Sequence, residues 1–127
     1  MMEEIGPVDV IIDDGGHTMN QQKTSFKVLF PYLKSDGVYI IEDLHTSYWR
    51  YYLKGTERVL CYDSPQTTIS YIKYLIDCVN FSGATIGKSD LFRKIPEEIK
   101  LDFFEKYLVE NIISINMHNG LCFIFKK

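Results

Sequence analysis

The sequence is poor in the features that mark several protein classes. It has three cysteines, widely separated and without the short spacings of zinc sites, which favours buried thiols in a reducing compartment over a disulfide framework: Cys61, Cys78 and Cys122. No apolar run is long enough to cross a membrane, and the acidic N-terminus MMEEIGPVD is not of the signal-peptide type. The formal net charge of −3 argues against a broad nucleic-acid-binding surface. We therefore expect a cytoplasmic protein with neither a membrane nor a nucleic-acid partner.

Apolar and aromatic residues are plentiful, at 46% and 14% of the 127 residues. A chain of this length suffices for one domain with one core of modest size. It contains no internal repeat, no low-complexity tract and no composition shift that marks a linker. We therefore predict that residues 1–127 form a single domain.

Two short apolar stretches frame the first part of the chain. Residues 8–13 are nearly all apolar and β-branched, which predicts a strand buried on both faces, as in a parallel sheet. Apolar residues then recur at helical spacing over residues 19–33, with Thr18 or Asn20 as the N-cap. After the turn KSDG, residues 37–42 read as a second buried strand. A helix between two strands forms a βαβ unit, so the two strands are expected to be parallel.

The second half predicts two helices and a terminal hairpin. After an irregular segment over residues 43–62, Ser64 is the expected N-cap of a helix with an apolar stripe at Ile69, Ile72, Leu75, Ile76 and Val79. A further helix is predicted from Pro96 to about Leu108, with candidate buried positions at Ile99, Phe103, Phe104 and Tyr107. Apolar strands at 112–116 and 121–125 flank Asn119-Gly120, a strong hairpin signal. The whole pattern predicts an α/β fold.

Both strands of the βαβ unit end in paired acids, Asp13-Asp14 and Glu42-Asp43. Ligands of open parallel sheets bind beyond the C-terminal ends of the strands, and neighbouring strands lie about 5 Å apart. Up to four carboxylates would therefore converge, and their repulsion would raise one or more pKa values unless a cation is bound. Carboxylate oxygens favour Mg²⁺, Mn²⁺ or Ca²⁺ over zinc. The acids thus predict a divalent-metal site.

His17 follows the first acidic pair by a short glycine turn, which brings its imidazole back over the same site. An imidazole titrates near neutral pH, so His17 is a candidate general base. Each feature also has a simpler explanation: acids at strand ends often cap helices or accept loop amides, and His17 is also typical of a solvated loop. Two acidic pairs on consecutive parallel strands, with a histidine nearby, favour the metal site.

The segment VDVIIDDGGHTMNQQKTSFKVLFPYLKSDGVYIIEDLHTSYW resembles the metal-dependent sugar O-methyltransferases of macrolide biosynthesis, the macrocin and mycinamicin O-methyltransferases, and the cephalosporin hydroxylase-like branch of that superfamily. The motif D-D-G-x-H follows one strand and I-E-D-L-H-T-x-Y-W follows the next. The match is dense over residues 8–49 and looser beyond. It implies a partial, Rossmann-like class I methyltransferase sheet made of the fourth to seventh strands, parallel except for the antiparallel terminal hairpin, and flanked by helices.

The resemblance also implies residue roles. Asp14, Glu42 and Asp43 match the family's magnesium ligands, and His17 matches its general base. Asp13 lies where the fourth strand passes the methionine end of the cofactor, S-adenosylmethionine. Three further residues of the matching segment would line the sugar pocket, with loop packing as the alternative: His45, Tyr48 and Trp49.

The implied reaction is methyl transfer to a sugar or glycoside. Mg²⁺ would chelate two neighbouring hydroxyls and lower the pKa of one. His17 would accept that proton, and the oxygen would attack the sulfonium methyl in line.

One part of that fold has no counterpart in the sequence. Class I methyltransferases begin with a strand and a glycine-rich turn that hold the cofactor, whereas here SGATIGKS follows a helix. We therefore expect the C-terminal half of the fold, with its strands in the order fourth, fifth, seventh, sixth. Residues 8–13 would then be an exposed apolar edge, which predicts a homo-oligomer or pairing with an N-terminal half partner.

Three hypotheses follow. The first is a metal-dependent sugar O-methyltransferase that is truncated or half of a split enzyme. The second is a non-catalytic remnant or a dimerising interaction module. The third is an oxidative or hydrolytic metal enzyme, suggested by the hydroxylase-like relatives; iron would suit two histidines beside one carboxylate, but here the acids dominate.

Overall fold

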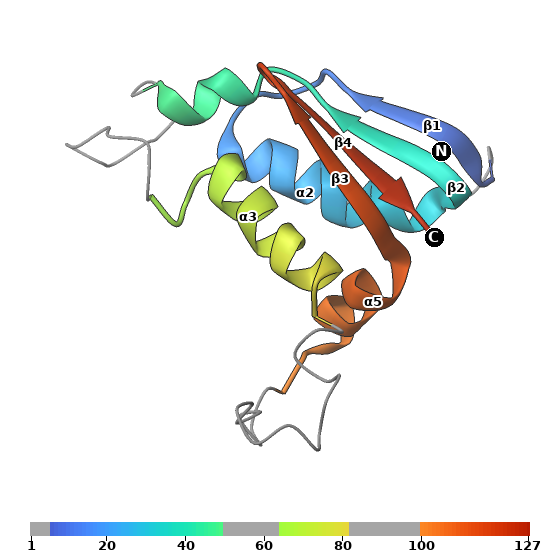
Figure 1. Ribbon diagram of the computed structural model, residues 1–127. Helices are drawn as coiled ribbons and strands as arrows, with labels where there is room; N and C mark the ends of the chain where they lie inside the picture. Colours follow the sequence, from blue (N-terminus) through green and yellow to red (C-terminus); the bar gives the residue numbers. More distant parts are fainter. Residues whose placement is uncertain (1–5, 50–63, 82–99) are drawn as a thin grey trace.

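The computed structural model describes residues 6–49, 64–81 and 100–127 (Figure 1). Its elements, with η for 3₁₀ helices, are β1 (Val8–Asp13), α2 (Met19–Leu29), η1 (Phe30–Tyr32), β2 (Leu33–Ile41), η2 (Leu44–Tyr48), α3 (Thr68–Val79), α5 (Phe103–Asn111), β3 (Ile112–His118) and β4 (Leu121–Lys126). The four strands form one sheet in the order β1-β2-β4-β3, with β1 and β2 parallel and the other pairs antiparallel. The predicted α/β class and strand order are confirmed.

The βαβ unit forms as predicted, with a shorter helix. Thr18 is the N-cap of α2 in a capping box: Gln21 N–H donates to the Thr18 hydroxyl (3.3 Å), and Thr18 N–H donates to Gln21 Oε1 (3.2 Å). The α-helix ends at Leu29 because Pro31 has no N–H to donate to the carbonyl four residues earlier, and a 3₁₀ turn over Phe30–Tyr32 follows. Leu33 already belongs to β2, so the predicted helix over residues 19–33 is four residues too long.

The predicted KSDG turn lies within β2, where the register against β1 slips across residues 33–38. Asp36 adopts a left-handed conformation (φ 62°). Gly37 is needed for close packing, since a Cβ there would lie 2.7 Å from Leu33 Cγ and 2.9 Å from the Asp9 carbonyl oxygen. The segment thus turns without leaving the sheet.

The core lies between the helices and one face of the sheet. Phe26 stacks on Phe30 (ring centroids 4.9 Å apart) and meets Tyr39 edge-on (5.2 Å). Strand, helix and loop residues complete this buried cluster: Leu33, Ile41, Leu44, Ile72, Leu75, Cys78, Leu108, Ile112, Cys122 and Ile124. Figure 1 shows α2 and α3 running along the same side of the sheet.

The opposite face of the sheet carries a second set of apolar residues that the described elements leave uncovered. Strand pairing aligns them in two rows, Val10–Val38–Phe125 and Ile12–Ile40–Phe123. Val10 and Ile12 are 51% and 60% exposed. The prediction that residues 8–13 are buried on both faces is therefore wrong for the described part of the chain, whereas the predicted exposed edge is confirmed.

The second-half helices begin later than predicted. Thr67, not Ser64, caps α3, and Ser70 N–H donates to its hydroxyl (3.0 Å). In the predicted stripe of α3, Ile76 is 41% exposed, and Cys78 is buried instead. Ser64 and Pro65 lie in the preceding turn.

Helix α5 starts at Phe103 because Asp102 and Glu105 form a reciprocal capping box. The predicted start at Pro96, the candidate Ile99 and Cys61 lie outside the described residues. Residues 100–102 are not helical and Phe103 is 90% exposed, so a continuous helix to Leu108 with Phe103 buried is wrong.

The predicted terminal hairpin is confirmed. Strands β3 and β4 are joined by Asn119-Gly120, with Gly120 at φ 78°. None of the helices in the described ranges is both long and apolar enough to span a membrane.

Candidate metal centre

Two loops at the C-terminal ends of the parallel strands carry the site. The first runs from Asp13 to the start of α2, and the second runs from β2 into η2. Glu42 N–H donates to the Asp13 carbonyl (3.1 Å), which continues the pairing of β1 and β2 just past the strands. The two loops therefore leave the sheet side by side, as the acidic strand ends predicted.

Three of the predicted side chains converge. Each of Asp14, His17 and Asp43 offers one ligand atom, and these atoms all lie within 4.8 Å of one another. His17 Nε2 is 3.3 Å from Asp43 Oδ2, and His45 Nδ1 is 3.7 Å from Asp43 Oδ1. Asp43 thus lies between two imidazoles, and its side chain is 42% exposed, so a solute can reach it.

The backbone of Asp43 is left-handed (φ 54°, ψ 36°). Few residues other than glycine adopt this region, although aspartate tolerates it better than most, and such conformations cluster at functional sites. The conformation turns the chain sharply from β2 into η2. It places the Asp43 carboxylate opposite His17.

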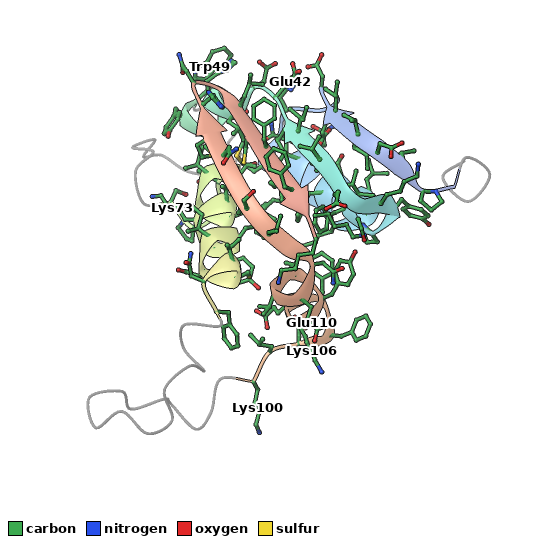
Figure 2. The ribbon with its side chains drawn as sticks, turned by 45° about the vertical axis from the view of Figure 1, so that its right-hand side comes forward. Glu42, Trp49, Lys73, Lys100, Lys106 and Glu110 are labelled. Carbon is green, nitrogen blue, oxygen red and sulfur yellow. The ribbon has the colours of Figure 1, made fainter. Side chains whose placement is uncertain are left out.

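Glu42 is not in this group, although the sequence predicted it as a ligand. Its carboxylate is absent from the cluster formed by the described residues, and its carbonyl accepts a hydrogen bond from Gln22 Nε2 (2.9 Å). Figure 2 shows Glu42 at the same end of the molecule as Trp49, beyond the strand ends. Glu42 therefore lies in the second loop, but its carboxylate is not one of the three converging groups.

Asp13 is not part of the cluster that the described residues form. Its side chain is 8% exposed, and its Oδ2 accepts a hydrogen bond from the Tyr39 hydroxyl (2.8 Å). Burial, reinforced by this bond and by the nearby charge of Asp13, raises the pKa of Tyr39. The predicted meeting of four carboxylates is therefore reduced to two carboxylates and an imidazole.

The three predicted sugar-pocket residues lie at the surface, and His45 adjoins the cluster of Asp14, His17 and Asp43. The rings of His45 and Trp49 touch, with centroids 4.7 Å apart and planes inclined at 63°. Tyr48 is 42% exposed and Trp49 is 51% exposed, so neither is a core residue. His45 connects this aromatic surface to Asp43.

Two buried polar residues that sequence reasoning missed support the loops. Gln22 is 1% exposed; besides its bond to Glu42, it accepts from the Thr68 hydroxyl (2.7 Å) and so joins α2, α3 and the second loop. Thr46, 2% exposed, contacts carbonyls of both loops. The signal for Gln22 was its place among the apolar positions of α2, three residues after Met19 and four before Phe26.

The donor set fits a divalent cation. Two carboxylates and a neighbouring imidazole converge at a solvent-accessible edge, and carboxylate oxygens are the ligands that Mg²⁺ and Mn²⁺ prefer. In open α/β sheets ligands bind beyond the C-terminal ends of the parallel strands, which is where these acidic loops lie.

Comparison with known proteins shows what the chain is similar to. No family model matches the chain. It is 48% identical over 79 residues to L-olivosyl-oleandolide 3-O-methyltransferase of Streptomyces antibioticus, a match that covers 62% of this chain and 20% of the relative. It is 28% identical over 121 residues to mycinamicin VI 2''-O-methyltransferase of Micromonospora griseorubida, covering 95% of this chain and 26% of the relative. Demethylmacrocin O-methyltransferase of Streptomyces fradiae is 29% identical over 121 residues, and the match covers 95% of this chain and 27% of the relative.

Solved structures of one such methyltransferase also match the chain. MycE methyltransferase in complex with Mg, SAH and mycinamycin VI matches with a TM-score of 0.68 and 27% identity, over 98% of this chain and 26% of that chain. A complex of the same enzyme with Mg and SAH matches with a TM-score of 0.69 and 29% identity, and the match covers 98% of this chain and 28% of that chain. The homologues of the chain are therefore sugar O-methyltransferases, and the match covers their C-terminal part. The chain spans only about a fifth to a quarter of the length of these relatives.

Proposed function

We propose that the chain is the metal-binding part of an S-adenosylmethionine-dependent O-methyltransferase that acts on a sugar or glycoside hydroxyl. The observation that carries the proposal is the convergence of Asp14, His17 and Asp43 at the ends of β1 and β2. The structural match to MycE, an enzyme whose complexes contain Mg and SAH, supports it.

We assign Asp14 and Asp43 as metal ligands, with Glu42 joining them through a change of side-chain rotamer. A bound Mg²⁺ would supply Lewis acidity, which lowers the pKa of a coordinated hydroxyl. The geometry is compatible with His17 as a third ligand or as a base. We assign it as the base because Mg²⁺ prefers oxygen ligands.

In the proposed reaction, His17 accepts the proton of the sugar hydroxyl at a ring nitrogen. S-Adenosylmethionine, when bound, would supply the methyl group that this oxygen takes up, with an O–C bond replacing the S–C bond and S-adenosylhomocysteine as the second product. We propose that Asp13 faces the methionine end of the cofactor through Oδ1. This oxygen lies on the loop side, 3.5 Å from where a Cβ on Gly15 would be, while Oδ2 is bonded to Tyr39.

The exposed aromatic surface beside the cluster would contact the sugar. Aromatic rings supply flat, amphipathic surfaces with a polar tip, and the exposure of Tyr48 and Trp49 leaves such surfaces accessible. His45, in contact with Trp49 and near Asp43, would place the sugar between this surface and the metal.

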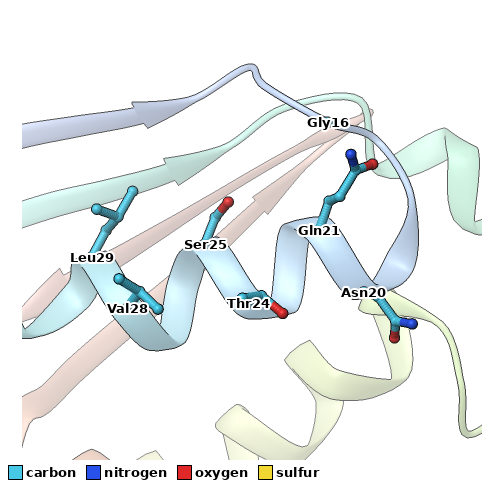
Figure 3. Close-up of a pocket in the computed structure, with 7 residues that line it drawn as sticks. All are labelled: Gly16, Asn20, Gln21, Thr24, Ser25, Val28 and Leu29. Atoms are coloured by element: carbon cyan, nitrogen blue, oxygen red, sulfur yellow. The ribbon is translucent and has the colours of Figure 1, made fainter.

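The open edge of β1 and the uncovered face of the sheet support the proposal that another polypeptide binds there. We propose that residues 1–127 form one domain that is completed by polypeptide corresponding to the rest of the relatives, attached or separate. That polypeptide would add a strand to the open edge of β1 and cover the sheet face that carries Val10 and Ile12. Beside α2 lies an open groove of about 560 Å³ whose lining includes Gly16, Thr24 and Val28 (Figure 3), which would accept a helix of the same partner.

The test is reconstitution. The mycinamicin relative without its matching C-terminal part is co-purified with this chain, and methyl transfer from S-adenosylmethionine is measured with and without Mg²⁺. The proposal predicts a complex with Mg²⁺-dependent activity, both lost in Ile12→Asp and retained in the matched control Ile113→Asp. Ile113 is similarly exposed (56% against 60%) but lies on β3, the opposite edge strand.

The alternative function is a non-catalytic remnant or dimerising module, favoured by the same open edge of β1. Self-association of the chain that Ile12→Asp abolishes, with neither metal binding nor activity in the complex, would support this alternative. We also propose a cytoplasmic location, which the free, buried thiols of Cys78 and Cys122 support.

A further inference from the structure

We propose that Thr46 is a positioning residue: its buried hydroxyl holds the two metal-site loops at a fixed separation and so sets the metal affinity. The inference rests on the proposed metal site. It concerns a residue that is not among the proposed ligands and does not face solvent, because Thr46 is 2% exposed and lies in η2, the turn that follows Asp43.

The hydroxyl of Thr46 lies between the backbones of the two loops. Its Oγ1 is 2.9 Å from the carbonyl oxygen of His17 and 2.8 Å from that of Asp43. One hydroxyl proton is shared between these two acceptors. The Asp43 carbonyl also accepts from Thr46 N–H (3.0 Å), so the backbone already satisfies it. The bond that depends on the side chain is therefore the one to the His17 loop.

This bond acts where the strand pairing has ended. The Glu42–Asp13 backbone bond closes the ladder, and beyond it each loop follows its own course. The contact between His17 and Asp43 cannot fix the separation of the loops, because both side chains are partly exposed and would rearrange around a cation. A buried hydroxyl bound to loop carbonyls does not need to move.

The η2 turn that contains Thr46 is held in place by other contacts. Leu44 N–H donates to the Gly120 carbonyl in the β3–β4 turn (3.1 Å), which ties the start of η2 to the hairpin. Ser47, fully buried, lies within hydrogen-bonding distance of Met19 Sδ (3.4 Å) and of the Ile69 N–H (3.4 Å). The hydrogen bond from Thr46 therefore fixes the His17 loop relative to the sheet and the helices.

The experiment is calorimetric titration of the complete 127-residue chain with Mg²⁺. Thr46→Val keeps the shape and removes the hydroxyl, whereas Thr46→Ser keeps the hydroxyl. Groups that orient metal ligands typically contribute 10- to 100-fold in affinity, so we expect Thr46→Val to weaken binding about 10-fold or more and Thr46→Ser to stay within about threefold.

Thr67→Val is the matched control. Thr67 is also buried, but its hydroxyl contacts the Ser64 carbonyl and the Ser70 hydroxyl at the start of α3. Loss of this helix cap lowers stability, and we expect it to leave Mg²⁺ affinity unchanged. Thr46→Ala, which puts no methyl group in place of the hydroxyl, is titrated as well in case Thr46→Val does not fold.

The outcomes separate this inference from the proposed function. If the wild type binds Mg²⁺ and Thr46→Val binds equally well, the inference is wrong and the metal site stands. If Thr46→Val and Thr67→Val weaken binding alike, the hydroxyl acts only through general stability, and the inference is again wrong. If the wild type gives no Mg²⁺ binding, the metal site itself is wrong, and the inference falls with it.

Discussion

The buried hydrogen bond between Tyr39 and Asp13 anchors the first site loop to the core, and removing the Tyr39 hydroxyl tests its strength. The Tyr39 side chain is fully buried, and its hydroxyl donates to Asp13 Oδ2 (2.8 Å). In Tyr39→Phe the ring contact with Phe26 remains and only this bond is lost. Hydrogen bonds to charged groups contribute about 1.5–3 kcal/mol, so we expect the free energy of unfolding to fall by about 2 kcal/mol.

Tyr71→Phe is the matched comparison, because it deletes the same atom. The Tyr71 hydroxyl is buried with no hydrogen-bond partner in the described part of the chain, and its desolvation is uncompensated. Its removal should leave stability unchanged or raise it by about 1 kcal/mol. A change of 1 kcal/mol shifts the Tm of a domain of this size by about 4 °C, so the two variants should differ by roughly 8–12 °C.

The assay is urea unfolding followed by circular dichroism, with thermal unfolding as a second measurement. Equal effects of the two substitutions would refute the reasoning, since the two hydroxyls differ chiefly in having a partner. A loss in Tyr39→Phe that persists in an Asp13→Ala background would show that Asp13 is not that partner.

Two further predictions concern the metal and pH. Asp14→Ala or Glu42→Ala should abolish the rise in Tm that Mg²⁺ produces, whereas His17→Ala should leave it nearly intact; if all three behave alike, the division into ligands and base is wrong. Burial raises the pKa of Tyr39 above its value of about 10 in the unfolded chain. The folded state therefore retains a proton that the unfolded state loses, and the stability present below pH 10 should fall as the pH rises beyond it. Urea unfolding at pH 9 and pH 11 measures this fall, and Tyr39→Phe should make it smaller.

The parts of the fold that the sequence predicted depend on local patterns. The strand at 8–13, the helix that begins after Thr18 and the hairpin at Asn119-Gly120 follow from periodicity, capping and turn chemistry between residues near one another in the chain. The order of the strands came from the family resemblance. The end of α2 and the start of α5 were predicted wrongly. A 3₁₀ turn containing Pro31 ends the first helix and a capping box at Asp102 begins the second, and the spacing of apolar residues reveals neither feature.

The convergence of Asp14, His17 and Asp43 was predictable because the ends of neighbouring parallel strands meet at one edge of the sheet. What that rule does not give is the direction of each side chain. Asp13 turns to Tyr39, 26 residues away, and this contact is invisible in any local pattern. Thr46 was missed for the same reason, since its partner His17 lies 29 residues earlier.

The most direct test of the central claim is calorimetric titration of the purified chain with Mg²⁺, alongside Asp14→Asn as a nearly isosteric control. The account predicts saturable binding of one Mg²⁺ per chain in the wild type and its loss in Asp14→Asn. No binding by the wild type, or binding that Asp14→Asn leaves unchanged, would contradict a metal centre at the ends of β1 and β2.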